Sequence, residues 1–207
     1  MLDLSELEAY DSLLIEEAQD LCKIFNLTTK VRRLLWLDRM LWSKINSDEC
    51  RFGADGVLSP DRMKGRLEPE EWKPIMASSL VFQKILATRM RVRFLVAIPV
   101  LFVVTLIGAG IATLLGNYES LFFLLFVLLV DVPILINAVT QLRKKRRLQA
   151  DAEAARVLGR DQFLNILRKI DGFGLDDLKR TEKRGIGRHF SGKPSVPERI
   201  VNLGAKT

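Results

Sequence analysis

A long apolar block in the middle of the chain constrains its fold more than any other feature. Residues 94–142 hold only two charged side chains, Glu119 and Asp131, whereas about 35% of the remaining residues are charged. This distribution excludes a uniformly hydrophilic soluble domain, a disordered chain and a collagen-like repeat. The chain has two cysteines and one histidine. A disulfide scaffold and a multi-histidine metal site within one chain are therefore excluded as well.

The apolar block predicts a transmembrane helical hairpin. Its two segments, residues 94–115 and 121–142, are joined by only five residues. Each segment has 22 residues, which is roughly 33 Å as a helix and enough to cross a hydrocarbon core of about 30 Å. A buried hairpin in a water-soluble protein is the alternative interpretation.

Basic residues flank both predicted spans, and the short connecting turn has no Lys or Arg. By the positive-inside rule, this pattern predicts a plasma-membrane protein with two spans and both termini in the cytoplasm. We expect anionic lipid headgroups to contact the flanking basic side chains. These are Arg89, Arg91, Arg93, Arg143, Lys144, Lys145 and Arg146. No aromatic stripe interleaves the basic residues, so nucleic-acid binding is not predicted.

Four residues of the apolar block are candidates for contact with a partner. Asp131 lies at the centre of the second segment, where an exposed charge is costly, so we expect it to face protein. It then hydrogen-bonds Thr105 at a similar depth in the hairpin, or it contacts another membrane subunit. Gly108 and Ala112 form a small-xxx-small pair that permits close helix packing. A membrane protein is therefore the predicted partner.

The remaining stretches, residues 1–93 and 143–207, predict a mainly α fold, with α+β possible through a small sheet in residues 30–60. Residues 31–37 fit a strand, but a helix running on to residue 45 fits nearly as well. Residues 46–60 and 172–193 have the composition of loops. Apolar periodicity predicts the following helices: 5–26, 68–90, 149–170 and 197–203.

The order of three segments carries a family resemblance. Residues 57–82 precede the apolar block, residues 143–171 follow it, and residues 193–203 contain Pro194-Ser195 and Glu198-Arg199-Ile200. In this order and spacing the chain resembles the HtpX-like family of membrane zinc metallopeptidases, which includes the CAAX prenyl proteases, over roughly a third of its length. The resemblance implies that residues 1–93 and 143–207 are two halves of one cytoplasmic metallopeptidase-like domain, into which the hairpin 94–142 is inserted.

The same resemblance implies that the catalytic positions are lost. The family's HExxH zinc motif, placed by its flanks, falls on residues 78–82, so that Ser78 and Phe82 replace the two histidines and Ser79 replaces the glutamate base. The glutamate that is the third ligand falls on Arg147, whereas Asp151 matches the family's aspartate four residues later. The helices 68–90 and 149–170 would face each other. Phe82 would fill the place of the metal, and Arg147 would pair with Asp151.

Zinc catalysis requires three protein ligands, an open position and a base near the bound water. All these groups are replaced here, and Lys193 also replaces a histidine that precedes proline in the family. We therefore predict a non-catalytic metallopeptidase homologue without a cofactor, which acts as a subunit, adaptor or regulator of a membrane protein complex. One alternative is a divergent membrane zinc metalloendopeptidase with substituted ligands. Another is a two-span protein with a basic, lipid-binding domain whose resemblance to the family is accidental.

Overall fold

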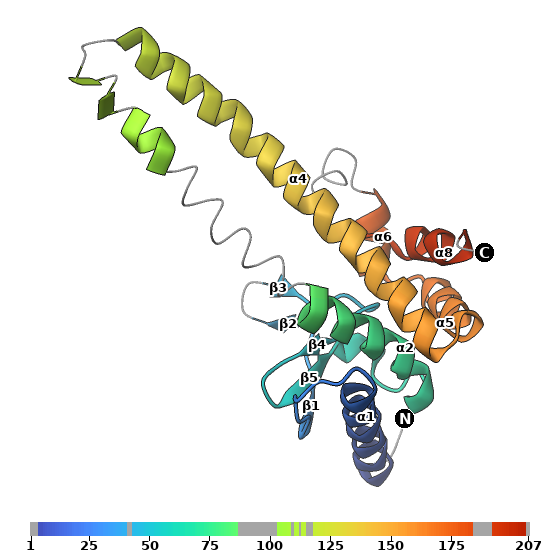
Figure 1. Cartoon of the computed structure of the whole chain (residues 1–207). Helices are drawn as coiled ribbons and strands as arrows, with labels where there is room; N and C mark the ends of the chain where they lie inside the picture. The colour runs from blue at the N-terminus through green and yellow to red at the C-terminus, as the bar shows by residue number, and fades with distance from the viewer. Residues whose placement is uncertain are drawn as a thin grey trace.

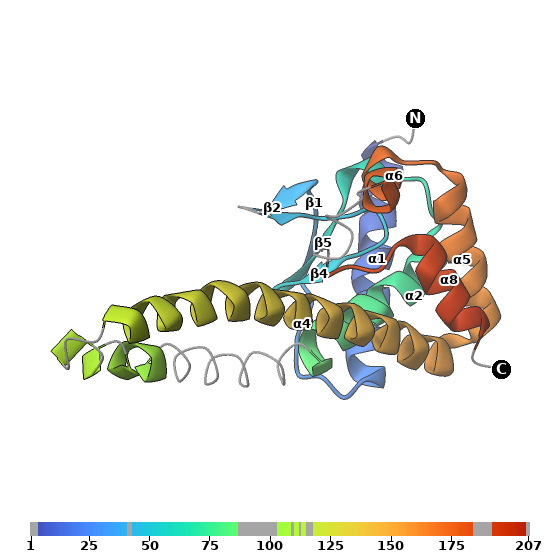
Figure 2. The same cartoon turned by 90° about the horizontal axis from the view of Figure 1, so that it is seen from above.

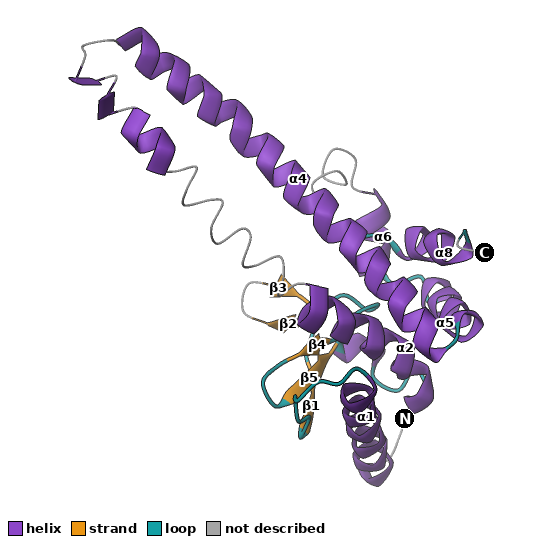
Figure 3. Ribbon diagram, in the orientation of Figure 1, coloured by secondary structure: helices purple, strands orange, loops and turns teal. Residues whose placement is uncertain are grey.

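The structure is a computed structural model of the chain. It describes residues 4–40, 43–86, 103–108, 110–111, 113–114, 118–183 and 192–205. This part of the chain is mainly helical and includes a small sheet (Figures 1 and 3). The helical elements are α1 (Leu4–Ile24), η1 (Asp61–Met63), α2 (Pro69–Leu80), η2 (Val81–Leu86), α4 (Tyr118–Leu158), α5 (Arg160–Gly172), α6 (Asp176–Lys183) and α8 (Val196–Gly204).

The sheet contains three short strands in the order β1 (Arg33–Trp36), β5 (Gly56–Ser59) and β4 (Arg51–Phe52). The β1–β5 pair is parallel and the β4–β5 pair is antiparallel. Gly56 is required at this point, because a Cβ atom there would lie 2.7 Å from the carbonyl oxygen of Arg33. A separate two-stranded ribbon joins β2 (Arg39–Met40) and β3 (Ser43–Lys44). Residues 31–37 are thus a strand rather than a helix, and the prediction that 46–60 is entirely loop is wrong.

The apolar core lies between α1, α2 and α5. The helix predicted at 5–26 is confirmed as α1, and its buried face has the predicted residues Leu14, Ala18, Leu21 and Cys22, each at most 2% exposed. From α2 the fully buried Trp72 packs edge-on against the ring of Trp36, with ring centroids 5.7 Å apart. The two indoles therefore connect the helical core to the sheet.

Local backbone chemistry sets the ends of the helices. A reciprocal capping box between Glu68 and Glu71 starts α2, with Pro69 in its first turn. The helix predicted at 149–170 is interrupted at Gly159, whose φ of +98° ends α4 and lets α5 begin in a new direction. The helix predicted at 68–90 is α-helical only to Leu80 and continues as a π-helix to Leu86; residues 87–90 lie outside the described part.

Two further predictions concern the C-terminal region. The expected terminal helix is confirmed as α8, Val196–Gly204. The interpretation of residues 172–193 as a loop is wrong in part, because α6 covers Asp176–Lys183 within it. Helix α6 has Asp176 and Asp177 in its first turn, where acidic side chains favour helix initiation.

The prediction of a two-span transmembrane hairpin is contradicted. Within the described ranges, no helix is both long enough and apolar enough to cross a membrane. The second predicted span is instead the beginning of α4, a 41-residue helix that continues through the basic run 143–147 into the domain. Figures 1 and 2 show α4 projecting well beyond the other labelled elements. The predicted fold class with an inserted hairpin and the predicted localisation in the plasma membrane are therefore wrong.

Candidate functional site

Polar side chains from α2, α4, α8 and the segment before β4 meet in the interior of the domain. All of them are at most 7% exposed. We call this group the buried polar cluster, and its members are Asp48, Ser78, Ser79, Arg147, Asp151 and Arg199. Four of the five positions singled out as degenerate catalytic positions belong to it, and the fifth, Phe82, borders it. The structure thus brings together residues that are up to 151 positions apart in the sequence.

Arg199 is the centre of the cluster. Its Nε and Nη2 atoms donate to the two carboxylate oxygens of Asp151, each at 2.8 Å, and its Nη1 atom donates to Asp48 Oδ2 at 2.7 Å. Ser78 donates its hydroxyl to Asp151 as well. Burial alone would raise the pKa of Asp151, but the charge and hydrogen bonds of Arg199 outweigh it and hold the pKa below its usual range. Asp151 is therefore ionised and fully engaged.

A well-formed helix start positions Arg199. Ser195 caps α8 by accepting from Glu198 N at 3.4 Å, and the Glu198 side chain accepts from Ser195 N at 3.1 Å. The backbone of Arg199 completes this turn by donating to the carbonyl oxygen of Ser195 at 3.0 Å. The serine, proline and glutamate that open α8 therefore fix the direction in which Arg199 enters the interior.

Arg147 occupies the position that the resemblance assigns to the third metal ligand. Its Nη2 atom donates to Ser79 Oγ at 3.3 Å and to the carbonyl oxygen of Asp48 at 3.4 Å, and its guanidinium lies 5.6 Å from the ring centroid of Phe82. Burial and the nearby charge of Arg199 lower the pKa of Arg147. The expected pairing of Arg147 with Asp151 is present as an attraction between their charges, whereas the hydrogen bonds to the Asp151 carboxylate come from Arg199 and Ser78.

The cluster has a small opening at one edge. There, a cavity of about 30 Å³ is lined by Asp48, Glu49, Phe82, Arg143, Arg147, Gly192, Lys193 and Pro194. Lys193 forms an ion pair with Glu49 across this edge. Burial would raise the pKa of Glu49, but the charges of Lys193 and Arg147 outweigh it, so that the pKa is lowered. The carboxylate of Glu49 is therefore ionised.

Ser78, Ser79 and Cys50 are not activated as nucleophiles. Ser78 donates its hydroxyl to the Asp151 carboxylate, but that carboxylate is a weak base because Arg199 lowers its pKa. Cys50 is fully buried, and burial raises the pKa of its thiol to about 12. The Ser79 hydroxyl oxygen accepts from Cys50 N at 3.0 Å and from Arg147. Both contacts withdraw electron density from that oxygen, whereas an activated serine needs a base that accepts its proton.

The residues present do not fit a catalytic zinc ion. A serine hydroxyl and a phenyl ring stand where the resemblance expects imidazoles, and the Arg147 guanidinium would repel a dication. Asp151, the aligned position that keeps its carboxylate, accepts hydrogen bonds from Arg199 on both oxygens. The Asp48 carboxylate is also engaged by Arg199. Within the described ranges, no group of three or more His, Cys, Asp or Glu side chains is arranged to hold a metal ion. His189 lies outside those ranges.

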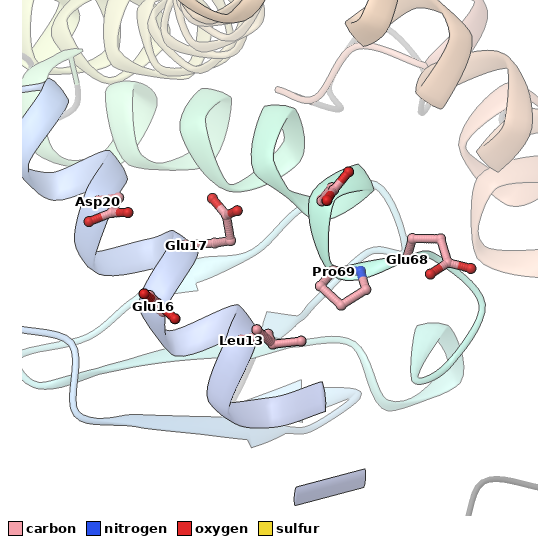
Figure 4. A pocket seen from close by; sticks show the side chains of 7 residues that line it. Leu13, Glu16, Glu17, Asp20, Glu68 and Pro69 are labelled. Carbon is pink, nitrogen blue, oxygen red and sulfur yellow. The ribbon is translucent and has the colours of Figure 1, made fainter. Parts of the chain in front are cut away.

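A second hollow lies on the side of α2 away from the buried polar cluster, and acidic side chains make up most of its lining (Figure 4). It has a volume of about 490 Å³ and is lined by Leu13, Glu16, Glu17, Asp20, Glu68, Pro69 and Glu70. Of its carboxylates, Glu17 is paired with Lys73 at 2.6 Å. No residue that the sequence singled out as a site lies in this acidic hollow.

The three described candidates of the apolar block are not members of the buried polar cluster defined above. Asp131 lies in α4 and Thr105 and Gly108 lie in the helical residues 103–108, whereas Ala112 lies outside the described part. Their assignment as membrane-embedded contacts depended on the transmembrane hairpin, which the structure contradicts.

Sequence reasoning missed Asp48 and the role of Arg199. Arg199 lies in the C-terminal segment that carries the family resemblance. It shares one face of a short helix with the buried Val196 and Leu203, and this position could have indicated that its side chain is buried. Asp48 lies in an irregular segment before β4, and no sequence pattern marks it.

Neither a family model, nor a curated protein, nor a solved structure shows significant similarity to this chain.

Proposed function

We propose that this chain is a non-catalytic, metallopeptidase-like protein whose role is binding, as a subunit, adaptor or regulator of a protein complex. One observation carries the proposal. The positions that the resemblance assigns to two zinc ligands and the base meet in one buried cluster, and the guanidinium of Arg147 stands among them.

Contacts between α2 and α4 support the resemblance. Ser78 is bonded directly to Asp151, and Arg147 reaches both Ser79 and Phe82. A chance alignment of two segments has no reason to bring the same positions into contact in space. The contacts are therefore consistent with a peptidase-like scaffold whose metal site has been replaced by an arginine network.

The chemistry of the replacement favours binding over catalysis. Hydrogen-bonded buried ions are held in one geometry, because separating them would leave an unpaired charge in the interior, which strongly destabilises the fold. Such a network keeps the two helices at a fixed distance. It does not supply the water-activating metal or the general base that peptide hydrolysis by this route requires.

Native mass spectrometry of the full chain, purified from its own cells, tests the proposal by reporting bound proteins and bound metal together. We expect a stoichiometric complex with a partner protein and no stoichiometric zinc. The same preparation should not cleave a mixed peptide library, with or without added zinc. Stoichiometric zinc together with chelator-sensitive cleavage would support the divergent-peptidase alternative and overturn the proposal.

Restoring the ligands tests the alignment itself. The variant Ser78→His, Ser79→Glu, Phe82→His, Arg147→Glu should gain stoichiometric zinc and a rise in melting temperature on zinc addition, because a ligand that binds only the folded state stabilises it. The matched control contains the first three changes and keeps Arg147. It should bind zinc much more weakly, since it lacks the third ligand and retains the buried cation.

A further inference from the structure

The charges around the small cavity and the adjoining buried polar cluster do not balance. The arginine of α8 engages two of the three carboxylates, and the lysine at the cavity edge engages the third. The four cations and three carboxylates are Arg143, Arg147, Lys193, Arg199, Asp48, Glu49 and Asp151. Arg143 and Arg147 therefore form no ion pair with a carboxylate in the described part of the chain, and the group carries one net positive charge.

Arg147 is the one of these two cations that has hydrogen-bond donors inside the domain. Both of its hydrogen bonds leave from Nη2, and both are long, at 3.3 and 3.4 Å. Its Nε and Nη1 donors have no hydrogen-bond partner among the described residues. Arg147 is only 6% exposed, yet its Nε and Nη1 are not among the enclosed side-chain atoms of the described residues that lack a partner, so both donors reach solvent. An anion that displaces this water would accept charge-assisted hydrogen bonds from them.

The cavity has the size and walls for one small anionic group. Its volume of about 30 Å³ exceeds the roughly 10–15 Å³ that a single water requires, so there is room for a small polar group. The ring of Phe82 forms an apolar wall, and the exposed Arg143 places a second cation at the mouth. At Gly192 the wall lies close to Arg143, because an added Cβ there would be 3.5 Å from the Arg143 side chain.

We propose that this cavity binds the carboxylate group of a peptide segment, which accepts charge-assisted hydrogen bonds from Arg147 beside the positive charge of Arg143. The inference rests on the proposed function and names the chemistry that this binding protein recognises. The place of a metal that would polarise a peptide carbonyl is then taken by a guanidinium that holds a peptide carboxylate.

Isothermal titration calorimetry of the full chain tests the inference with N-acetyl-trialanine and its C-terminal amide as probes. The free acid should bind at least about tenfold more tightly than the amide, since a hydrogen bond to a charged group contributes about that much. Arg147→Gln should abolish this preference. Lys145→Gln removes the same charge from an exposed position two residues away and should leave the preference within about twofold. Equal binding of acid and amide would overturn the inference.

Two further measurements keep the test decisive. If Arg147→Gln does not fold, Arg143→Gln changes only an exposed residue at the mouth and should still reduce the preference by about threefold; no reduction would overturn the inference. Inorganic phosphate should compete no better than acetate, and stronger competition by phosphate would contradict the carboxylate assignment. The zinc measurement above is independent. A chain that lacks zinc and shows no preference for the free acid would overturn this inference alone. A chain that binds stoichiometric zinc would overturn the proposed function.

Discussion

The largely buried stretch of α2, residues 72–80, has two halves, 72–76 and 77–80, which are held by different forces. The first half contributes Trp72, Ile75 and Met76 to the apolar core. The second half buries Ser78 and Ser79 completely, and both hydroxyls contact charged side chains of α4. Apolar burial is favourable in proportion to area and needs no particular partner. Burial of a polar group is favourable only when each of its partners is present.

This difference shows where the sequence departs from what folding alone requires. An apolar second half would join α2 to α4 at lower electrostatic cost, because replacing a buried ion network by hydrophobic residues is often neutral or stabilising. The chain instead retains charged residues there. The first half is therefore explained by the fold, and the second half is the part for which we propose a function.

Arg199→Met should produce the largest loss of stability. The change leaves Asp151 and Asp48 buried without their cation, and breaking a buried pair in this way costs about 3–5 kcal/mol. Urea denaturation measures the change in the free energy of unfolding. Arg156→Met is the matched control, because it removes an exposed arginine paired with Glu153 and should cost at most about 0.5 kcal/mol. Equal losses in the two variants would contradict the electrostatic account of the cluster.

Ile75→Ala tests the apolar half of α2. Ile75 is fully buried, and truncation of such a side chain costs about 2–5 kcal/mol through lost transfer free energy and a residual cavity. The loss should be the same at pH 7 and pH 4, since no ionisable group changes its environment. A loss that depended strongly on pH would show that the two halves of α2 are coupled.

Ser78→Ala should have a smaller and pH-dependent effect. It removes a hydrogen bond to the ionised Asp151 and should cost about 1.5 kcal/mol at pH 7. The pKa of Asp151 is lowered in the folded state, so the stability that its ionised form contributes is present above its unfolded pKa of about 3.9 and is lost as the pH falls below it. The gap between wild type and Ser78→Ala should therefore narrow below about pH 4. Ser79→Ala removes contacts with Arg147 and Cys50 rather than with Asp151, so the stability gap between wild type and this variant should stay constant with pH.

The sequence predicted the parts of the fold that depend on local pattern. The amphipathic spacing in α1 and the Ser-Pro-Glu start of α8 act within a few residues, and both helices are present. The break at Gly159 was missed because the apolar periodicity continues across it, and only the backbone shows its positive φ. From hydropathy alone, residues 121–142 were predicted to be a membrane span. In the structure they belong to one continuous helix, α4, which runs on through the charged residues 143–158. Hydropathy does not reveal this continuity.

The candidate site was only partly predictable for a similar reason. Family resemblance placed Ser78, Ser79 and Arg147 near one another, and the structure brings them together. Helical spacing suggested Arg147, one turn away, as the partner of Asp151, and Arg147 contributes only its charge. A bidentate contact from Arg199, 48 residues later, takes that place. Long-range pairing of this kind depends on tertiary packing and leaves no local pattern.

The smallest expected effect concerns an ion pair at the surface of the same region. Lys169 on α5 contacts Glu71 in the first turn of α2 at 2.6 Å, and both side chains are partly exposed. Lys169→Met should cost only about 0.5 kcal/mol, because water and salt screen the pair. Repeating the denaturation in about 1 M salt should remove most of even this difference, since the Debye length is then about 3 Å. The buried Arg199 pairs should be far less sensitive to the same salt. A Lys169 effect that survives high salt would mean that packing of the lysine stem, rather than its charge, joins α5 to α2.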